Sequence, residues 1–149
     1  MGLLDKNFNI FNKRKEPSNT FSLTRLKRSF RAAFDGIKST YKREQNIKIY
    51  TIVSILLVIF GLILKINYVE WLICFVLIGF MLMAEFFNTA IEHVVDLCSP
   101  NYHPLAKKAK DTAAAGVLMM AFISALVGLI IFVPKLIDFI GGLLWKMNY

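Results

Sequence analysis

The sequence predicts an all-α membrane protein in which an amphipathic surface helix precedes three transmembrane helices. Two properties of the composition support this class: 56% of the 149 residues are hydrophobic, and the mean hydropathy is +0.55. The third observation is that the apolar residues gather in three long runs. Each run approaches or exceeds the roughly 20 helical residues that cross a hydrocarbon core of about 30 Å.

The three apolar runs define the elements of the predicted membrane domain, which covers residues 21–135. We place the spans at residues 47–66, 70–96 and 112–134. Only residues 67–69 separate the first two spans, so these must form an antiparallel hairpin. The second and third are joined by a predicted cytoplasmic loop, 97–110.

Positive charge predicts the orientation of the protein. Of the 18 Lys and Arg residues, 12 precede or open the first span, and three more lie between the second and third spans. The positive-inside rule therefore predicts a cytoplasmic amino terminus and, after three crossings, an external carboxyl-terminal tail, 136–149. The first 46 residues contain no apolar run of sufficient length, so we expect no cleaved signal peptide.

Two different segments precede the first span. Residues 1–20 are polar and lack periodicity, which predicts a flexible basic cytoplasmic tail. Residues 21–38 have apolar side chains three and four positions apart and basic side chains on the other faces, which predicts an interfacial amphipathic helix with a bend near Gly36. The apolar positions are Leu23, Leu26, Phe30, Phe34 and Ile37.

Four polar side chains share one stripe of the second span. Glu85, Asn88, Glu92 and Asp96 are spaced by three, four and four residues, which places them on one helical face. Carboxylates inside a membrane segment are costly and usually functional. Glu44 precedes the first span, so the predicted hairpin brings it to the same membrane face as the end of this stripe.

These oxygen-rich side chains suit several kinds of chemistry. Carboxylates at a membrane face can hold Mg²⁺, which commonly bridges phosphates, and Lys110 beside Asp111 adds a cation for phosphate and another oxygen ligand. The set fits phosphoryl transfer to a lipid alcohol. Ion paths and helix association also use such stripes, so these alternatives stay open. The sequence has no soluble-type nucleotide motif, and its basic tail is no evidence for nucleic acid binding.

Two segments carry a resemblance to a known family. Residues 84–96, AEFFNTAIEHVVD, and residues 103–115, HPLAKKAKDTAAA, closely resemble the prokaryotic diacylglycerol kinase and undecaprenol kinase family. The resemblance covers roughly Phe21 to Lys135. It implies an ATP- and Mg²⁺-dependent lipid kinase of the bacterial cell (inner) membrane that works as a homotrimer. Its sites lie at subunit boundaries, so Glu44 can serve a site completed by a neighbouring chain.

The resemblance also implies roles for individual residues. Glu85 matches the catalytic base, and Glu44 and Glu92 match the carboxylates that hold the metal. The lipid substrate is expected beside Arg25 and Glu85. The positions expected to contact ATP are Arg25, Glu44, Asn88, Glu92, Tyr102, His103, Lys110 and Asp111. Ala32 and Asn101 depart from contact residues found in some members, so neither contact is carried over.

Three alternatives remain open from the sequence. The forms of the two motifs are more similar to the Gram-positive branch, which implies undecaprenol as the acceptor, with diacylglycerol as the second candidate. A non-enzymatic membrane subunit or proton-coupled carrier, with Glu85 and Glu92 as a relay, is the alternative from another class. Asp96 either contacts nucleotide or pairs with Lys107 or Lys108.

Overall fold

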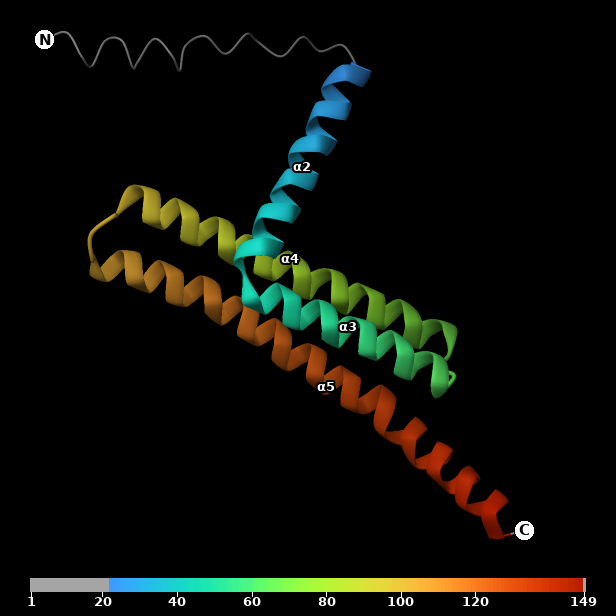
Figure 1. Ribbon diagram of the computed structural model, residues 1–149. Helices are drawn as coiled ribbons and strands as arrows, with labels where there is room; N and C mark the ends of the chain where they lie inside the picture. Colours follow the sequence, from blue (N-terminus) through green and yellow to red (C-terminus); the bar gives the residue numbers. More distant parts are fainter. Residues whose placement is uncertain (1–21, 149) are drawn as a thin grey trace, which may run out of the picture. The chain divides into compact units, whose positions relative to one another are not determined.

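The computed structural model describes residues 22–148, and within this range the chain is helical without any strand (Figure 1). The helices are α2 (Leu23–Arg43), α3 (Gln45–Ile63), α4 (Tyr68–Cys98) and α5 (Pro104–Asn148). The predicted all-α class is confirmed. The predicted tail 1–20 lies outside the described residues.

The chain separates into two compact units, which divide after Gly36. Helix α2 begins in the first unit and continues through Gly36 to Arg43, so the predicted helix 21–38 ended too early and the expected bend is absent from α2. One glycine inside a helix costs only about 1 kcal/mol relative to alanine, which good helix formers such as Lys38 and Lys42 offset. All side chains of α2 are unburied, and its location at a membrane surface stays a prediction.

Three helices are long and apolar enough to cross a membrane, as the sequence predicts. The first span ends earlier than expected, at Ile63 rather than 66, because the chain turns there. Lys65 has a positive φ of 51° in that turn. Helix α4 then begins with a capping box, in which Asn67 Oδ1 accepts from the Glu70 amide at 2.9 Å and Glu70 Oε2 accepts from the Asn67 amide at 2.6 Å.

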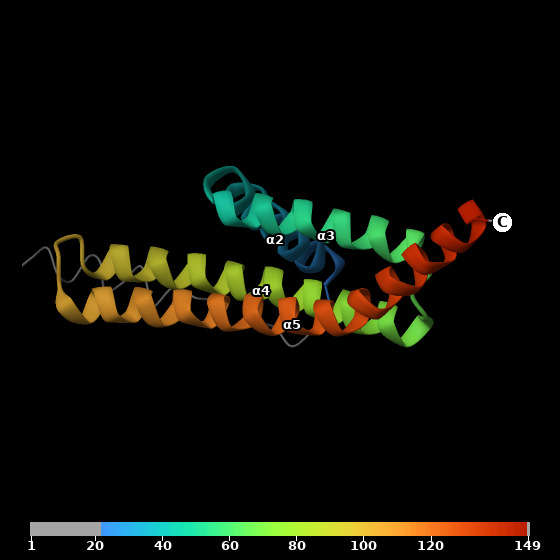
Figure 2. The same ribbon diagram turned by 90° about the horizontal axis from the view of Figure 1, so that it is seen from below.

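Helices α4 and α5 pack side by side over much of their length, and α3 lies against α4 (Figures 1 and 2). A small core near the α3–α4 turn consists of Ile66, Cys74 and Ile131. The ring of Trp71 lies directly against Gly61, where an added Cβ would come within 2.8 Å of it. Most other apolar side chains of these helices stay exposed in the single chain, which is expected of surfaces that face lipid or other helices.

The predicted loop 97–110 and tail 136–149 are wrong in extent. Helix α4 continues to Cys98 and α5 begins at Pro104, so the connection is only residues 99–103. Proline is well suited to the start of a helix, and His103 Nδ1 accepts a hydrogen bond from the Leu105 amide at 3.2 Å. At the other end α5 continues through Pro134 to Asn148, because the apolar sequence beyond the proline is compatible with a helix.

Candidate active site

Glu85 is the buried carboxylate at the centre of the candidate site. Its side chain is only 1% exposed, and among the described residues Oε2 has no hydrogen-bond partner. A buried carboxylate without full compensation destabilises a fold, so such a group is usually kept for function. The position of this residue on α4 agrees with its predicted place on the stripe.

Polar side chains before α3, at its start and on α4 act on Glu85. The carboxylates of Glu44 and Glu92 both interact electrostatically with it, and the side chain of Asn46 hydrogen-bonds to it. Glu44 lies between two helices, in an extended conformation at the N-cap of α3. The break between α2 and α3 therefore brings Glu44 toward the stripe of α4 within the same chain.

The sequence did not predict Asn46 and Tyr50 as site residues. Tyr50 interacts electrostatically with Glu85, one helical turn beyond Asn46. The available signal was a polar amide and a phenol at i and i+4 at the start of an otherwise apolar span. That spacing places both on one face of α3.

The polar stripe continues along α4 toward water. Asn88 Nδ2 donates to Glu92 Oε1 at 3.3 Å, while in the described part of the chain the buried Asn88 Oδ1 has no partner. Buried Thr89 donates from Oγ1 to the carbonyl of Glu85 at 3.0 Å. The stripe thus offers two buried oxygens, on Glu85 and Asn88, that a ligand can engage.

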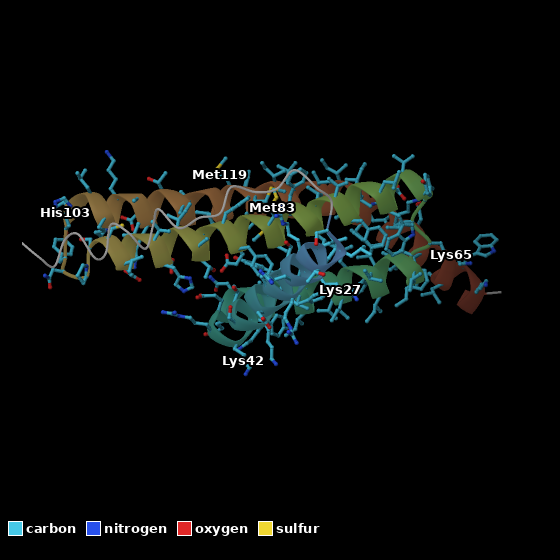
Figure 3. The ribbon with its side chains drawn as sticks, turned by 90° about the horizontal axis from the view of Figure 1, so that it is seen from above. Lys27, Lys42, Lys65, Met83, His103 and Met119 are labelled. Atoms are coloured by element: carbon cyan, nitrogen blue, oxygen red, sulfur yellow. The ribbon has the colours of Figure 1, made fainter. Side chains whose placement is uncertain are left out.

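A second group of predicted residues gathers where α4 and α5 are joined. Tyr102, His103, Lys110 and Asp111 line one pocket of about 290 Å³, together with Asp96. Figure 3 shows His103 at this end of the α4–α5 pair and Lys65 at the opposite end. The structure therefore brings the four predicted nucleotide residues of the loop and α5 together.

Two ion pairs organise this pocket. Lys110 Nζ lies 2.6 Å from Asp96 Oδ1, and Lys107 Nζ lies 2.6 Å from Asp111 Oδ2. The predicted pairing of Asp96 with Lys107 or Lys108 is therefore wrong, because Asp96 pairs with Lys110. Lys107 is one turn from Asp111 on α5 and pairs within its own helix, whereas Lys110 faces α4. Ion pairs this exposed contribute little stability, so both lysines can exchange a carboxylate for a phosphate.

The arrangement of the carboxylates can be compared with the ways in which proteins bind Mg²⁺. The described residues contain no cluster of three or more His, Cys, Asp or Glu side chains arranged as a metal cage. Mg²⁺ rarely uses such a cage, because it is commonly held by one or two carboxylates together with substrate phosphates and water. Glu44 and Glu92 both act electrostatically on Glu85, and Glu92 also accepts a hydrogen bond from Asn88, so these two carboxylates fit that mode of binding.

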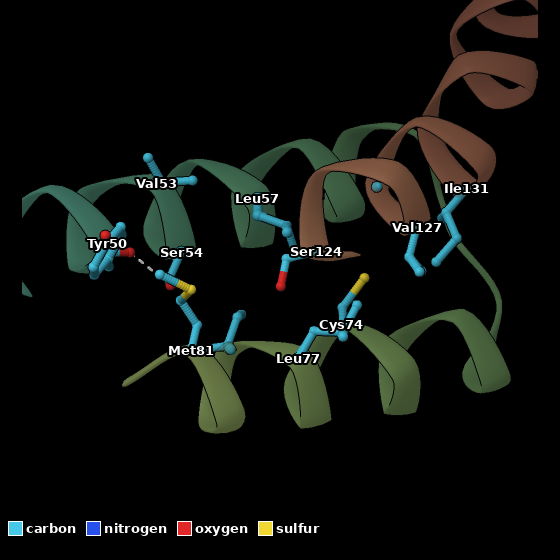
Figure 4. Close-up of a pocket in the computed structure, with 12 residues that line it drawn as sticks. Tyr50, Val53, Ser54, Leu57, Cys74, Leu77, Met81, Ser124, Val127 and Ile131 are labelled. Atoms are coloured by element: carbon cyan, nitrogen blue, oxygen red, sulfur yellow. Dashed lines mark hydrogen bonds between the residues drawn. The ribbon is translucent and has the colours of Figure 1, made fainter. Parts of the chain in front are cut away.

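An apolar cavity of about 80 Å³ lies between α3, α4 and α5, beginning one turn from Glu85 at Met81 (Figure 4). Its walls are almost entirely apolar apart from Tyr50, Ser54 and Ser124, and the Ser54 hydroxyl donates to the Tyr50 carbonyl at 2.7 Å. Arg25 belongs to the first unit of the chain, so its contact with nucleotide and lipid stays a prediction.

Fold and site together define a helical integral membrane protein with a carboxylate site between its spans and a pocket with two lysine–aspartate ion pairs at one end. The sequence also matches the family described as prokaryotic diacylglycerol kinase over residues 31–132, most of the chain. The protein belongs to this family of lipid kinases.

Individual relatives agree with this assignment. The undecaprenol kinase of Bacillus subtilis (strain 168) is 45% identical over 114 residues, which cover 76% of this chain and 93% of that protein. The diacylglycerol kinase of Helicobacter pylori (strain J99) is 32% identical over 66% of this chain and 82% of its own length. The diacylglycerol kinase of Escherichia coli (strain K12) is 24% identical over 73% and 89%.

Membership of a kinase family decides between the classes that the sequence left open. The protein is an enzyme that transfers phosphate from ATP, rather than a non-enzymatic subunit or proton-coupled carrier. The carboxylates and lysines described above are accordingly candidates for its active site.

Proposed function

We propose that the protein phosphorylates undecaprenol at the expense of ATP, forming undecaprenyl phosphate. The observation that carries this choice of acceptor is the 45% identity to an undecaprenol kinase over nearly all of that relative, against 32% and 24% to two diacylglycerol kinases. Diacylglycerol, which would give phosphatidic acid, is the second candidate because relatives of that name also match.

In this proposal Glu85 is the catalytic base. Its Oε2 takes the proton of the lipid hydroxyl, the hydroxyl oxygen attacks the γ-phosphorus of ATP, and the bond to the β–γ bridging oxygen breaks to release ADP. Burial of Glu85 and its unpartnered oxygen support the role, since the oxygen is available to one incoming hydroxyl. Asn46 orients the carboxylate through its hydrogen bond.

The remaining residues bind and orient the phosphoryl donor. Glu44 and Glu92 would hold Mg²⁺ bound to ATP, and the ion would neutralise charge on the phosphates. Asn88 positions Glu92 through the bond between their side chains. Nucleotide contacts are assigned to Arg25, Tyr102, His103, Lys110 and Asp111, with Lys110 on the phosphates and Arg25 also near the lipid headgroup.

The proposal includes an assembly and an orientation. We assign a homotrimer in the bacterial cell membrane, with the amino terminus and active site cytoplasmic and the carboxyl terminus external. The distribution of Lys and Arg supports the orientation. Self-association is supported by the low burial of the spans, since no more than 17% of the most apolar stretch of any span is buried within one chain.

Parallel phosphoryl-transfer assays test the function. The purified protein in mild detergent micelles is given Mg-ATP labelled on the γ-phosphate, with undecaprenol or diacylglycerol as the acceptor. We expect labelled undecaprenyl phosphate to form faster, and Glu85→Gln to form neither product. Faster labelling of diacylglycerol would replace the proposed acceptor, and folded protein that labels neither lipid would contradict the proposed reaction.

A further inference from the structure

The last part of α5 is an amphipathic helix that neither the active site nor the family match accounts for. Helix α5 has 45 residues, about 68 Å at 1.5 Å per residue, whereas a hydrocarbon core is roughly 30 Å thick. The family match ends at residue 132, just before Pro134. Residues 135–148 therefore form an added helical segment, which we call the terminal helix.

An ion pair marks where the terminal helix leaves the bundle. Lys135 Nζ lies 3.4 Å from Oε2 of Glu70, and both side chains are only partly exposed. Glu70 belongs to the capping box that opens α4, so this level is the end of the α3–α4 hairpin. Charged groups at this level place the membrane surface close to Lys135, which means that the terminal helix begins where the hydrocarbon core ends.

The residues beyond Lys135 divide into two faces. One arc of the helix carries only large apolar side chains, which are 43–65% exposed in the single chain: Leu136, Ile137, Ile140, Leu143 and Leu144. At 100° per residue the opposite arc carries Lys135, Asp138, Gly142 and Lys146, with the exposed Phe139 beside Lys146 at its edge. Trp145, an aromatic residue of the kind enriched at membrane interfaces, lies at the boundary between these arcs.

A straight continuation of α5 into water would expose the whole apolar arc. Pro134 removes one backbone hydrogen bond of α5 and is a common cause of helix kinks, so the chain can change direction at this level. Figures 1 and 2 show the end of α5 extending past the other helices and turning away from their direction. An interfacial position buries the apolar arc while the charged arc stays in water.

We propose that the terminal helix binds the lipid surface on the side of the α3–α4 hairpin, lying in the interface with its apolar arc in the acyl region. The partner is the bilayer itself rather than a second protein. Lys135 and Lys146 on the polar arc place positive charge at the level of lipid phosphates, with Asp138 toward water. The segment would anchor one end of α5 independently of the catalytic reaction.

The emission of Trp145 reports this position. Full-length protein and Trp145→Phe are reconstituted in vesicles of phosphatidylcholine and phosphatidylglycerol, and the difference between their spectra isolates Trp145 without disturbing Trp71. We expect blue-shifted emission that is quenched most by lipids brominated near the glycerol backbone, less by lipids brominated near the chain ends, and weakly by aqueous iodide.

Two aspartate variants provide a matched comparison. Ile140→Asp places a charge on the apolar arc, whereas Gly142→Asp places the same charge on the polar arc, where an added Cβ meets no atom within 4 Å. Ile140→Asp should shift the Trp145 emission to the red and remove most of the lipid quenching, while Gly142→Asp should retain both. Both variants should keep the lipid kinase activity.

Two results would overturn the proposal. Strong iodide quenching without lipid quenching in the unmodified protein would show that the terminal helix stands in water. Protection of Trp145 from both quenchers would show that protein, such as a second copy of the chain, covers it instead.

Discussion

At the scale of single residues, the candidate site is marked by buried oxygens that have no protein partner among the described residues. Glu85 Oε2 and Asn88 Oδ1 are both buried and unpartnered among the described residues, one turn apart on α4. Such groups lower stability unless a ligand satisfies them. In the proposed site, substrate and metal-bound nucleotide would complete the hydrogen bonding of this helix.

The variant Glu85→Gln tests whether Glu85 is the catalytic base. The amide keeps the size of the side chain but cannot accept the hydroxyl proton, so kcat should fall roughly 100- to 10,000-fold. Binding of Mg-ATP, measured by isothermal titration, should stay near normal. Glu70→Gln is the matched control, since this carboxylate lies at the opposite end of α4 and should leave kcat unchanged. Near-normal turnover by Glu85→Gln would exclude it as the base.

The lysines of α5 allow a similar comparison. Lys110→Met removes the charge assigned to the phosphates, a contact worth about 1.5–3 kcal/mol, so the KM for ATP should rise roughly 10- to 100-fold. Lys108→Met removes an exposed charge from the same segment and should change this KM little. Equal effects of both changes would indicate general electrostatic attraction of ATP rather than a specific contact at Lys110.

At the scale of elements, the α3–α4 hairpin holds the two halves of the site in register. Glu44 and Asn46 come from the start of α3, and Glu85 and Glu92 come from the later part of α4. The close contact of Gly61 with Trp71 sets how near the two helices lie at the opposite end. Small residues of this kind allow membrane helices to approach closely.

Gly61→Ala should therefore destabilise the hairpin. The added methyl group would lie 2.8 Å from the Trp71 ring and 3.1 Å from Ile66, and overpacking of this kind typically costs about 1–3 kcal/mol. Gly79→Ala is the control, because its Cβ meets nothing within 4 Å and alanine favours helix. Unfolding in mixed micelles of dodecylmaltoside and dodecyl sulfate measures both. Equal stability of the two variants would contradict a close helix contact at Gly61.

At the scale of the whole molecule, the single chain leaves much apolar surface uncovered, as expected of spans that face lipid and neighbouring chains. Glu44 and Glu92 nevertheless both act electrostatically on Glu85 of the same polypeptide. We therefore propose that each site of the proposed trimer takes Glu44, Glu85 and Glu92 from one subunit.

Mixed oligomers test this arrangement. Glu44→Gln and Glu85→Gln chains, unfolded together and refolded, should stay inactive. Each chain then lacks one carboxylate of its own set of Glu44, Glu85 and Glu92. Mass measurement in detergent should first show three chains in each assembly. A control mixture of wild-type and Glu85→Gln chains should keep activity in proportion to its wild-type content. Recovery of activity in the doubly mutant mixture would mean that Glu44 completes the site of a neighbouring subunit.

Much of the fold and site follows from the pattern of residues along the chain. The three apolar runs predict the spans, and the spacing of Glu85, Asn88 and Glu92 predicts a shared helical face, because both depend only on local periodicity. Asn46 was missed because its partner Glu85 is distant in sequence and lies on another helix. The ends of α2 and α5 were misplaced because Gly36 and Pro134 weaken a helix locally without ending it.

The sequence by itself determined the class of protein, the spans and the family, since hydropathy, helical period and motif are properties of neighbouring residues. Only the tertiary structure decided which groups meet: Asn46 with Glu85 across two helices, and Lys110 rather than Lys107 or Lys108 with Asp96. The physical reason is that such contacts depend on the rotation and register of packed helices, which local spacing along one helix does not specify.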